Sequence, residues 1–301
     1  MKILYFTDGY AEKVMGTKIS IATELKKYCE VVILQCGQIT QILNLIEEYA
    51  PDMVWLVHTG LKLSKQVKDK IKIPVVGVGM SDPYMQEKVS LESYDVYITN
   101  HDKTFGHLKD RIFTIYNQTA CDFLFHKDLE LEKTIDVSII GLGTHIQWGT
   151  ENSVRIDYAT KLRGVGVDVK AYGQRWNAHP NNFQHIEGSA FLDVINKTKL
   201  GLDIQADFAP LAHRMFEYSA CGTPVLTRRR SEVYRVFKED EEILMYDNYS
   251  ELEEKVLYYL GRPLELQKIG NNAKARCNVD HNVSNRVAHI VKELKMNNFW
   301  R

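Results

Sequence analysis

The sequence has few cysteines, almost no net charge and no long apolar run, and each shortage excludes a class of protein. The five cysteines are scattered and none forms a C-x-x-C pair, so neither a disulfide framework nor a zinc site is indicated. The formal net charge of −1 gives no bulk electrostatic reason to expect nucleic-acid binding. No apolar run reaches a membrane-spanning length, and the stretch M-K-I-L-Y-F-T-D-G at the N-terminus is too short for a signal peptide. We therefore expect a protein of the reducing cytoplasm.

The composition is that of a globular protein, with 45% hydrophobic and 26% charged residues over a length of 301 that suits two domains. Short apolar runs alternate with segments of helical periodicity in the first part of the chain. This alternation predicts a parallel sheet with helices on both faces. We expect strands at 2–6, 31–34, 53–57, 75–79, 95–99 and 112–116, and helices at 18–28, 39–49, 61–71 and 102–110.

The alternation pauses at 117–134, which has no clear period and indicates a linker, and it restarts with the apolar run 135–141. The restart predicts a second α/β domain of the same kind. We expect an N-terminal domain over 1–125, a second domain over 134–285 and a C-terminal helix over 286–301. The second domain should contain strands at 135–141, 167–172, 200–204, 224–227 and 241–246, and helices at 151–164, 189–197, 210–221, 249–260 and 264–278, and a last helix is expected at 282–296.

The stretch 209–227 carries the strongest local signal. Pro210 suits the first turn of a helix, and Gly222 suits its end, where a positive φ is required. A helix N-terminus offers N–H groups and a positive dipole end to an anion. A cation in the first turn and a carboxylate one turn later can hold a phosphate and a sugar hydroxyl, although an ordinary surface ion pair is the alternative. The apolar face carries Leu211, Met215, Phe216 and Ala220, and the opposite face carries His213, Arg214 and Glu217.

The run H-R-M-F-E-Y-S-A-C-G-T-P-V-L-T resembles the donor-site segment of GT-B glycosyltransferases, closest to the CgeB-like spore-maturation group of glycosyl transferases group 1. The segments D-V-S-I-I-G, Y-G-Q-R-W and K-L-G-L-D-I upstream match in the same order and spacing, so the resemblance covers about 134–290. It implies two Rossmann-like domains facing a cleft. The acceptor would bind to the first domain and the nucleotide-sugar to the second, and the C-terminal helix would cross back to the first domain.

On the donor side, the resemblance selects G-L-G-T at 141–144, with Gly141, Gly143 and Thr144. Glycines at a strand end let backbone N–H groups approach a phosphate, although a tight strand-to-helix turn is the alternative because the third glycine of a dinucleotide motif is absent. Arg155 matches a basic position of the family, and its guanidinium can bond two diphosphate oxygens at once.

The aromatic segment Y-G-Q-R-W places Gly173 at a strand end and offers Trp176 or Tyr172 for stacking on a nucleobase, with a core aromatic as the alternative. Glu217 matches the second carboxylate of the two-glutamate motif of retaining glycosyltransferases. The first would fall at Ala209, so the catalytic part of that motif is missing and the stereochemical outcome stays open. The donor-binding candidates are Gly141, Gly143, Thr144, Arg155, Gly173, Trp176, His213, Arg214 and Glu217.

In the first domain, polar residues follow the predicted strands at the edge where a ligand would bind. Asp8 and Gly9 follow the first strand, and His58 follows the third. His58 can act as a general base, although a lone histidine is more often structural. Asp82 precedes a proline, so turn chemistry is its alternative. We expect Asp8, Gly9 and His58 on the acceptor side, and His58, Asp82 and Arg214 in catalysis.

No D-x-D triplet occurs, so a metal-dependent grip on a sugar diphosphate has no support in the sequence. The leaving diphosphate would be stabilised by cationic side chains and a helix N-terminus. The run Arg228–Arg230 can meet phosphate, or it can be a solvated charge run. We expect no metal and no cofactor besides the nucleotide-sugar co-substrate, which the resemblance suggests is UDP-linked.

The sequence thus predicts a metal-independent glycosyltransferase that moves a sugar to a hydroxyl acceptor, which is a glycan, a protein or a small molecule, with DNA less favoured by the charge. Three alternatives stay open. One is a sugar-nucleotide epimerase on the same architecture. The others are a non-catalytic spore or surface protein and a phage-type DNA-modifying sugar transferase.

Overall fold

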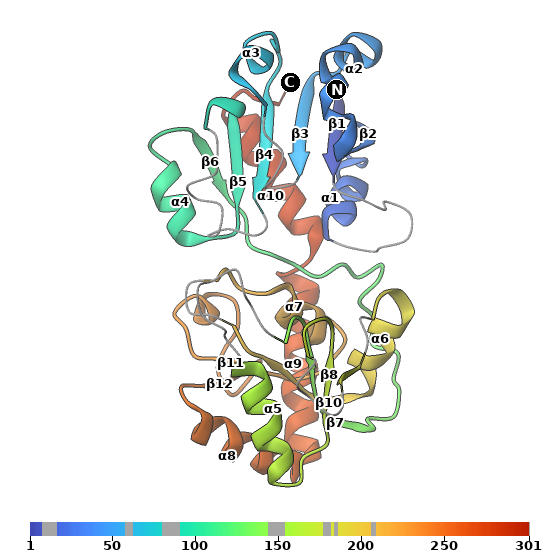
Figure 1. Ribbon diagram of the computed structural model, residues 1–301, viewed down its shortest axis with the longest axis vertical. Helices are drawn as coiled ribbons and strands as arrows, with labels where there is room; N and C mark the ends of the chain where they lie inside the picture. Colours follow the sequence, from blue (N-terminus) through green and yellow to red (C-terminus); the bar gives the residue numbers. More distant parts are fainter. Residues whose placement is uncertain are drawn as a thin grey trace. The chain divides into compact units, whose positions relative to one another are not determined.

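The computed structural model describes residues 1–7, 17–57, 63–79, 91–143, 154–176, 182–183, 186–205 and 209–300. The chain forms two compact α/β units, each built on its own parallel sheet (Figure 1). Unit 1 comprises Met1–Ala120, Phe208–Leu211 and Val283–Arg301, and unit 2 comprises Cys121–Asp207 and Ala212–Asn282. The described helices include none that is long and apolar enough to span a membrane.

The sheet of unit 1 has six parallel strands in the order β2-β1-β3-β4-β5-β6. The strands β1, β3 and β4 are short apolar runs buried along most of their length, as expected for a sheet covered on both faces, whereas the edge strand β2 is largely half-buried. The strand order reverses between β1 and β3, and this is where ligands bind in such sheets. The strands are β1 (Lys2–Thr7), β2 (Glu30–Gln35), β3 (Met53–Val57), β4 (Val75–Gly79), β5 (Val96–Thr99) and β6 (Phe113–Tyr116).

Alternate residues of these strands supply two cores. Tyr5 and Trp55 face the helices α1 (Thr17–Leu25) and α10 (Val283–Met296), and Leu4 and Phe6 belong to the opposite core with α2 (Ile42–Tyr49). The C-terminal helix α10 therefore returns to unit 1, as the resemblance implied (Figure 1). The shorter helices are η1 (Cys36–Gln41), a 3-10 helix, α3 (Lys65–Lys68), η3 (Leu91–Ser93) and α4 (Asp102–Leu108).

The sheet of unit 2 has the order β12-β11-β10-β7-β8-β9, again all parallel. The chain begins in the middle with β7 and reverses direction across the sheet between β7 and β10, as in a dinucleotide-binding fold. The strands are β7 (Ile135–Ile140), β8 (Val169–Tyr172), β9 (Asn182–Phe183), β10 (Thr198–Asp203), β11 (Val225–Arg228) and β12 (Leu244–Tyr246).

The helices of unit 2 cover this sheet with apolar faces. Ala159 and Leu162 of one helix and Leu252 and Val256 of another join the strands in a single core. These helices begin and end within three residues of the predicted ones. They are α5 (Val154–Gly164), α6 (Gly188–Lys197), α7 (His213–Ala220), α8 (Tyr249–Leu260) and α9 (Pro263–Val279), with a short 3-10 helix η5 (Val233–Arg235).

Helix α7 begins at His213, three residues later than the helix start predicted from Pro210. The reason is that the chain just before it belongs to unit 1, where the Thr119 hydroxyl donates to the Leu211 carbonyl at 3.4 Å. Ala212 is therefore extended and precedes the first helical residue. The end of the helix is as predicted, with Gly222 at a φ of 70°.

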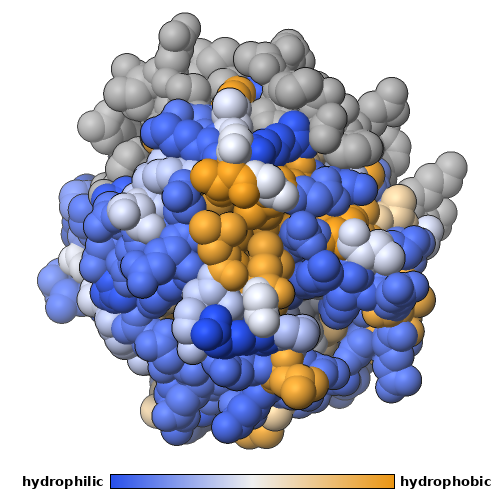
Figure 2. Space-filling model, turned by 90° about the horizontal axis from the view of Figure 1, so that it is seen from below, coloured by the Kyte–Doolittle hydropathy of each residue, from blue (hydrophilic) through white to orange (hydrophobic). Residues whose placement is uncertain are grey.

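Exposed apolar side chains gather on the face shown in Figure 2. Helices α8 and α9 meet at a tight turn, and Leu257 and Leu264 beside that turn are 46% and 80% exposed. The strands and the inner helix faces still bury the great majority of the large apolar side chains in the described ranges.

Candidate active site

One arginine bridges the ends of β7 and β10, the strands between which the order of the unit 2 sheet reverses at its switch point. Arg155 on α5 donates through Nη1 to the Leu142 carbonyl at 2.7 Å, and through Nε and Nη2 to the Ile204 carbonyl at 2.9 and 2.7 Å. Leu142 follows β7 and Ile204 follows β10, so the guanidinium ties together the two strand ends that flank the switch point. A diphosphate contact by Arg155 stays a prediction, and it has to share the guanidinium with these carbonyls.

The glycines of the expected phosphate loop make close backbone contacts instead of lying open. The N–H groups of Gly141 and Gly143 donate to the Tyr172 and Gln174 carbonyls at 2.8 and 2.9 Å. A Cβ on Gly143 would lie 2.3 Å from the Arg175 carbonyl oxygen, and a Cβ on Gly173 would lie 2.2 Å from that of Gly141. The segments 141–143 and 172–176 therefore interlock as a double loop at the carboxyl ends of β7 and β8. Thr144 lies outside the described residues.

Trp176 belongs to this double loop and to the core. Its side chain is completely buried, and its indole Nε1 donates to the Gly141 carbonyl at 2.8 Å. A fully enclosed ring offers no free face to a nucleobase, so the burial of Trp176 favours the core-aromatic alternative. Tyr172 is 7% exposed and is buried in the same way.

Helix α7 brings Arg214 and Glu217 together as an ion pair at its N-terminal turn. The pair is not an ordinary surface pair, because the Glu217 side chain is 11% exposed while that of Arg214 is 34% exposed. The Arg214 guanidinium also lies 4.5 Å from the ring centroid of Phe191 on α6. Burial alone would raise the pKa of Glu217, but the positive charge of Arg214, with contributions from His126 and His213, lowers it below its ordinary value. Glu217 is therefore a charged acceptor held at the edge of the site.

His126 joins this pair and was not expected from the sequence. Its Nε2 lies 3.7 Å from the Glu217 carboxylate, and its side chain is 7% exposed. It belongs to the segment predicted as an aperiodic linker, so no periodicity pointed to it. Its approach to Glu217 depends on tertiary folding.

A second polar cluster lies where β10 and β11 end side by side, with Asp203 paired to Thr227 in register. The Asp203 carboxylate accepts hydrogen bonds from the Gln205 amide and from the Thr227 hydroxyl at 3.2 Å. Burial raises the pKa of Asp203 above its ordinary value, despite opposing contributions from Arg155 and these donors. Arg230 in turn donates to the Gln205 side-chain oxygen at 3.4 Å. The resemblance covered Asp203 and Thr227, and the arginine run included Arg230, but no sequence signal grouped these residues with Gln205.

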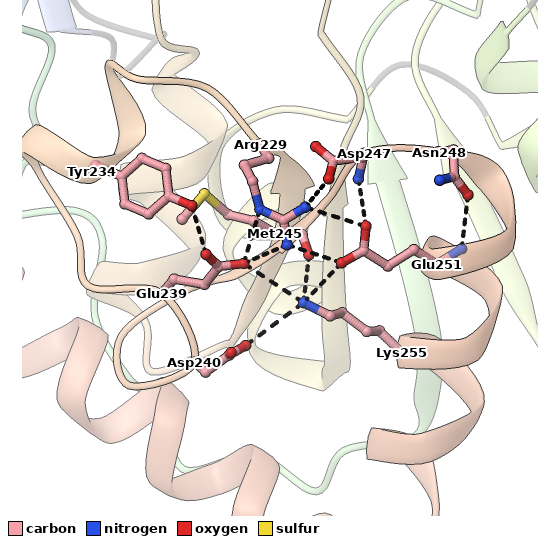
Figure 3. A network of polar contacts seen from close by, with 9 residues as sticks. All are labelled: Arg229, Tyr234, Glu239, Asp240, Met245, Asp247, Asn248, Glu251 and Lys255. Carbon is pink, nitrogen blue, oxygen red and sulfur yellow. Dashed lines mark hydrogen bonds and ion pairs between the residues drawn. The ribbon is translucent and has the colours of Figure 1, made fainter.

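Arg229, at the centre of the run Arg228–Arg230, is paired with carboxylates and is not available to bind a phosphate. Arg229 pairs with Glu239, Asp247 and Glu251. Lys255 pairs with two of these acids, Glu239 and Glu251, and also with Asp240, as Figure 3 shows. The hydrogen bonds that Arg229 donates to Glu251 and Glu239 raise the pKa of Arg229. The network fastens the connection between β11 and β12 to helix α8. It is made of paired charges that hold a loop.

Unit 1 contains a cavity at the carboxyl ends of β4, β5 and β6. Its floor is apolar and includes Trp55 and Ile98, and its polar lining includes Asn100 and Asn117. The side-chain oxygens of these two asparagines are buried and have no hydrogen-bond partner among the described residues. Four site residues predicted from the sequence, Asp8, Gly9, His58 and Asp82, lie outside the described residues.

No group of three or more histidine, cysteine, aspartate or glutamate side chains placed to hold a metal ion occurs within the described ranges. Metal independence stays a prediction.

Comparison with known families supplies the class of protein. The model of a family described as glycosyl transferase-like matches residues 127–292, which is more than half of the chain. The chain therefore belongs to the glycosyl transferase-like family. A comparison with curated protein sequences finds no match.

Solved structures show the same GT-B fold over nearly the whole chain. An alpha-glucosyltransferase in complex with UDP and a 13-mer DNA has a TM-score of 0.71 at 15% identity, covering 98% of this chain and 99% of the other. Sucrose-phosphate synthase from Thermosynechococcus elongatus has a TM-score of 0.70 at 13% identity, covering 99% of each chain. HepE from Anabaena in complex with UDP-glucose has a TM-score of 0.69 at 12% identity, covering 98% and 100%. At these identities the likeness concerns the fold.

Proposed function

We propose that the protein transfers a sugar from a nucleoside diphosphate sugar, with UDP as the nucleotide, to a hydroxyl group of an acceptor. The observation that carries this proposal is the Arg214–Glu217 pair at the N-terminal turn of α7, inside the range matched by the family model. Two of the similar folds carry UDP or UDP-glucose in their structures, which supports the choice of nucleotide.

The two side chains have complementary roles in this proposal. Arg214 is the more exposed of the pair, and its planar guanidinium suits two oxygens of a diphosphate. Glu217 is charged, and a carboxylate has about four acceptor positions in all, so it can accept ribose hydroxyls beside Arg214. Charge builds on the diphosphate as the glycosidic bond breaks. A guanidinium aimed at it stabilises the transition state more than the ground state.

We further propose that the acceptor binds to unit 1. Asp8 and Gly9 directly follow β1, and His58 directly follows β3, on the two strands between which the order of that sheet reverses. His58 is the proposed base for the acceptor hydroxyl, with Asp82 as a second catalytic candidate. The amide oxygens of Asn100 and Asn117, which lack a partner among the described residues, support a hydroxyl-rich acceptor, since each can accept a hydroxyl hydrogen.

Calorimetric titration of the wild-type chain with UDP, UDP-glucose, GDP and ADP tests the donor half. UDP compounds should bind, and Glu217→Ala should weaken them by about 10- to 100-fold, the equivalent of a lost charge-assisted hydrogen bond of about 1.5–3 kcal/mol. Glu254→Ala is the matched control, because Glu254 is exposed on α8 of the same unit. Unchanged affinity in a folded Glu217→Ala protein would remove the central residue of the proposal.

Donor consumption then distinguishes the reaction classes. A glycosyltransferase should slowly hydrolyse UDP-glucose in the absence of an acceptor, and turnover should rise with a suitable hydroxyl compound. Conversion of the donor sugar to an isomer without acceptor would indicate an epimerase. If the donor binds tightly but no acceptor supports turnover, the protein has the fold of a glycosyltransferase without its catalytic activity. Ala209, in place of the first glutamate, is consistent with that outcome.

A DNA acceptor is the second candidate, and the observation that favours it is the fold shared with a glucosyltransferase bound to DNA. The net charge of −1 speaks against it, because binding to phosphates draws on basic side chains. Affinity for a short duplex at several salt concentrations decides between the candidates. Binding that weakens steeply with salt supports DNA, and no binding at low salt excludes it.

A further inference from the structure

The carboxylate of Glu217 is held from two sides by different parts of unit 2. Oε2 pairs with Arg214 on the same helix, and Oε1 lies 3.7 Å from Nε2 of His126. His126 belongs to residues 121–134, which precede β7 and are called the crossover segment below. Helix α7 alone therefore does not determine where Glu217 points. The crossover segment supplies the second contact.

The hydrogen bonding of His126 assigns its tautomer. The backbone N–H of Asp122 donates to Nδ1 at 3.0 Å, so Nδ1 is an acceptor and the neutral ring carries its hydrogen on Nε2. Burial lowers the pKa of His126, against the opposing charges of Glu217 and Asp122. A neutral imidazole thus presents an N–H to Glu217, and the carboxylate keeps its charge for a ligand.

The ring of Phe191 contacts both the crossover segment and the ion pair of α7. Phe191 on α6 stacks with Phe125 at 6.3 Å between centroids, takes the edge of His126 at the same distance, and carries the Arg214 guanidinium 4.5 Å from its centroid. The crossover segment and the ion pair of α7 therefore rest on a common platform. A displacement of the crossover segment changes the surroundings of both charged side chains.

We propose that His126 is a positioning residue for the donor site. Its Nε2–H, 3.7 Å from the Glu217 carboxylate, attracts Oε1 electrostatically and so favours the orientation that accepts a nucleoside hydroxyl. His126 acts through Glu217 without touching the reacting atoms. This inference rests on the proposed donor role of Glu217. The charged and titratable groups around His126 are Asp122 on its own segment and Glu217 and Arg214 on α7, and α6 presents the ring of Phe191. His213 acts on Glu217 from the same helix.

The test compares His126→Phe, which keeps a ring of similar size, with His126→Gln, whose amide can place an N–H near the position of Nε2. UDP affinity by calorimetry, and KM and kcat for the donor, are measured on both. We expect His126→Phe to raise the Kd for UDP and the KM for the donor by about three- to tenfold, within the range of coupled neighbours, and His126→Gln to restore most of the affinity. His107→Phe is the control, because His107 is exposed and bonds Arg111 in unit 1.

A titration by NMR gives a readout that needs no ligand. Because the charge of Glu217 favours the protonated form of His126, Glu217→Gln should lower the pKa of His126 further. An unchanged pKa would overturn the contact on which the inference depends. If both His126 variants lose melting temperature and keep wild-type affinity per folded molecule, His126 is structural and the inference is wrong.

The outcomes also separate this inference from the proposed function. If the wild-type chain does not bind UDP, the proposed function fails, and the inference fails with it. If Glu217→Ala weakens UDP binding and His126→Phe does not, only the inference fails. Weakening by both single variants, with less than additive weakening in the double variant, is the result that we expect.

Discussion

The hydroxyl of Tyr218 lies 2.6 Å from the hydroxyl of Ser138, with both side chains buried. The Thr198 hydroxyl extends the chain by donating to Ser138 at 2.8 Å. Ser138 belongs to β7 and Thr198 to β10, so this network attaches α7 to the two strands beside the switch point. Because Tyr218 directly follows Glu217, rotation of α7 that moved the carboxylate would break these bonds.

Gly201 provides the space for this attachment, because a Cβ there would lie 2.8 Å from the ring of Tyr218. We expect Gly201→Ala to destabilise the protein by about 1–3 kcal/mol, as for other overpacked cores, and to weaken UDP binding by shifting α7. Urea denaturation and calorimetry measure the two effects. Gly106→Ala in helix α4 is the control, since nothing lies within 4 Å of the position that its new methyl group would take, and it should be neutral or stabilising by about 0.5–1 kcal/mol.

The interlocked double loop gives a second glycine prediction. Gly143→Ala would push the 141–143 segment off the Arg175 carbonyl and Trp176, so donor affinity and melting temperature should both fall. The loss of stability should be about 1–3 kcal/mol. Gly164→Ala at the end of α5 has nothing within 4 Å and should leave donor affinity unchanged. Normal affinity and stability in Gly143→Ala would show that the loop is not rigid.

Arg214 offers a test of chemistry against structure. Arg214→Ala should lower kcat more than it weakens UDP binding, because the guanidinium is expected to stabilise the departing diphosphate. Lysine should restore only part of the rate, since it lacks the planar fork. If Arg214 only pairs with Glu217 and packs on Phe191, the opposite result is expected, in which the melting temperature falls and turnover per folded molecule stays near normal. Measuring both on the same variants separates the two accounts.

The Arg229 network predicts acid sensitivity. The hydrogen bond from Arg229 lowers the pKa of Glu251 to about 2 from an ordinary 4.5, so this stabilisation is complete above pH 4.5 and is lost as the pH falls toward 2. Arg229→Met should lower the free energy of unfolding at pH 7 by about 1–2 kcal/mol, between the values for exposed and buried pairs. It should also reduce the further loss of stability between pH 4.5 and pH 2. Arg262→Met, which breaks an exposed pair with Glu265, should do neither. If the free energy of unfolding falls equally steeply with decreasing pH in Arg229→Met and in the wild type, this account is wrong.

Metal independence is tested by chelation. Sugar transfer should survive EDTA and should not rise with added manganese or magnesium. Loss of turnover in EDTA that manganese restores would require a metal-assisted grip on the diphosphate. Donor binding measured with and without EDTA serves as the companion control, since it separates an effect on affinity from an effect on the reaction.

The sequence predicted what depends on neighbours along the chain. Helix α8 occupies the predicted range, because its periodicity and the Asn248 side chain at its start are local signals, and Gly222 ends α7 as expected. The candidate site was predicted only in part. His126 and Arg229 contact partners on distant segments, and no local pattern encodes such contacts. The identity of Trp176 does not by itself say whether its ring is exposed for stacking or buried in the core.

Helix α10 has a consequence for how the chain is assembled during synthesis. Most of unit 1 precedes unit 2 along the chain, but its core requires Val287, Ile290 and Leu294, which are synthesised after unit 2. Until then the sheet face carrying Tyr5 and Trp55 is covered by α1 alone among the described helices, whereas unit 2 has its sheet and helices complete by Asn282. Unit 1 therefore begins before unit 2 and is completed after it, and removing α10 should leave a folded unit 2 attached to an aggregation-prone unit 1.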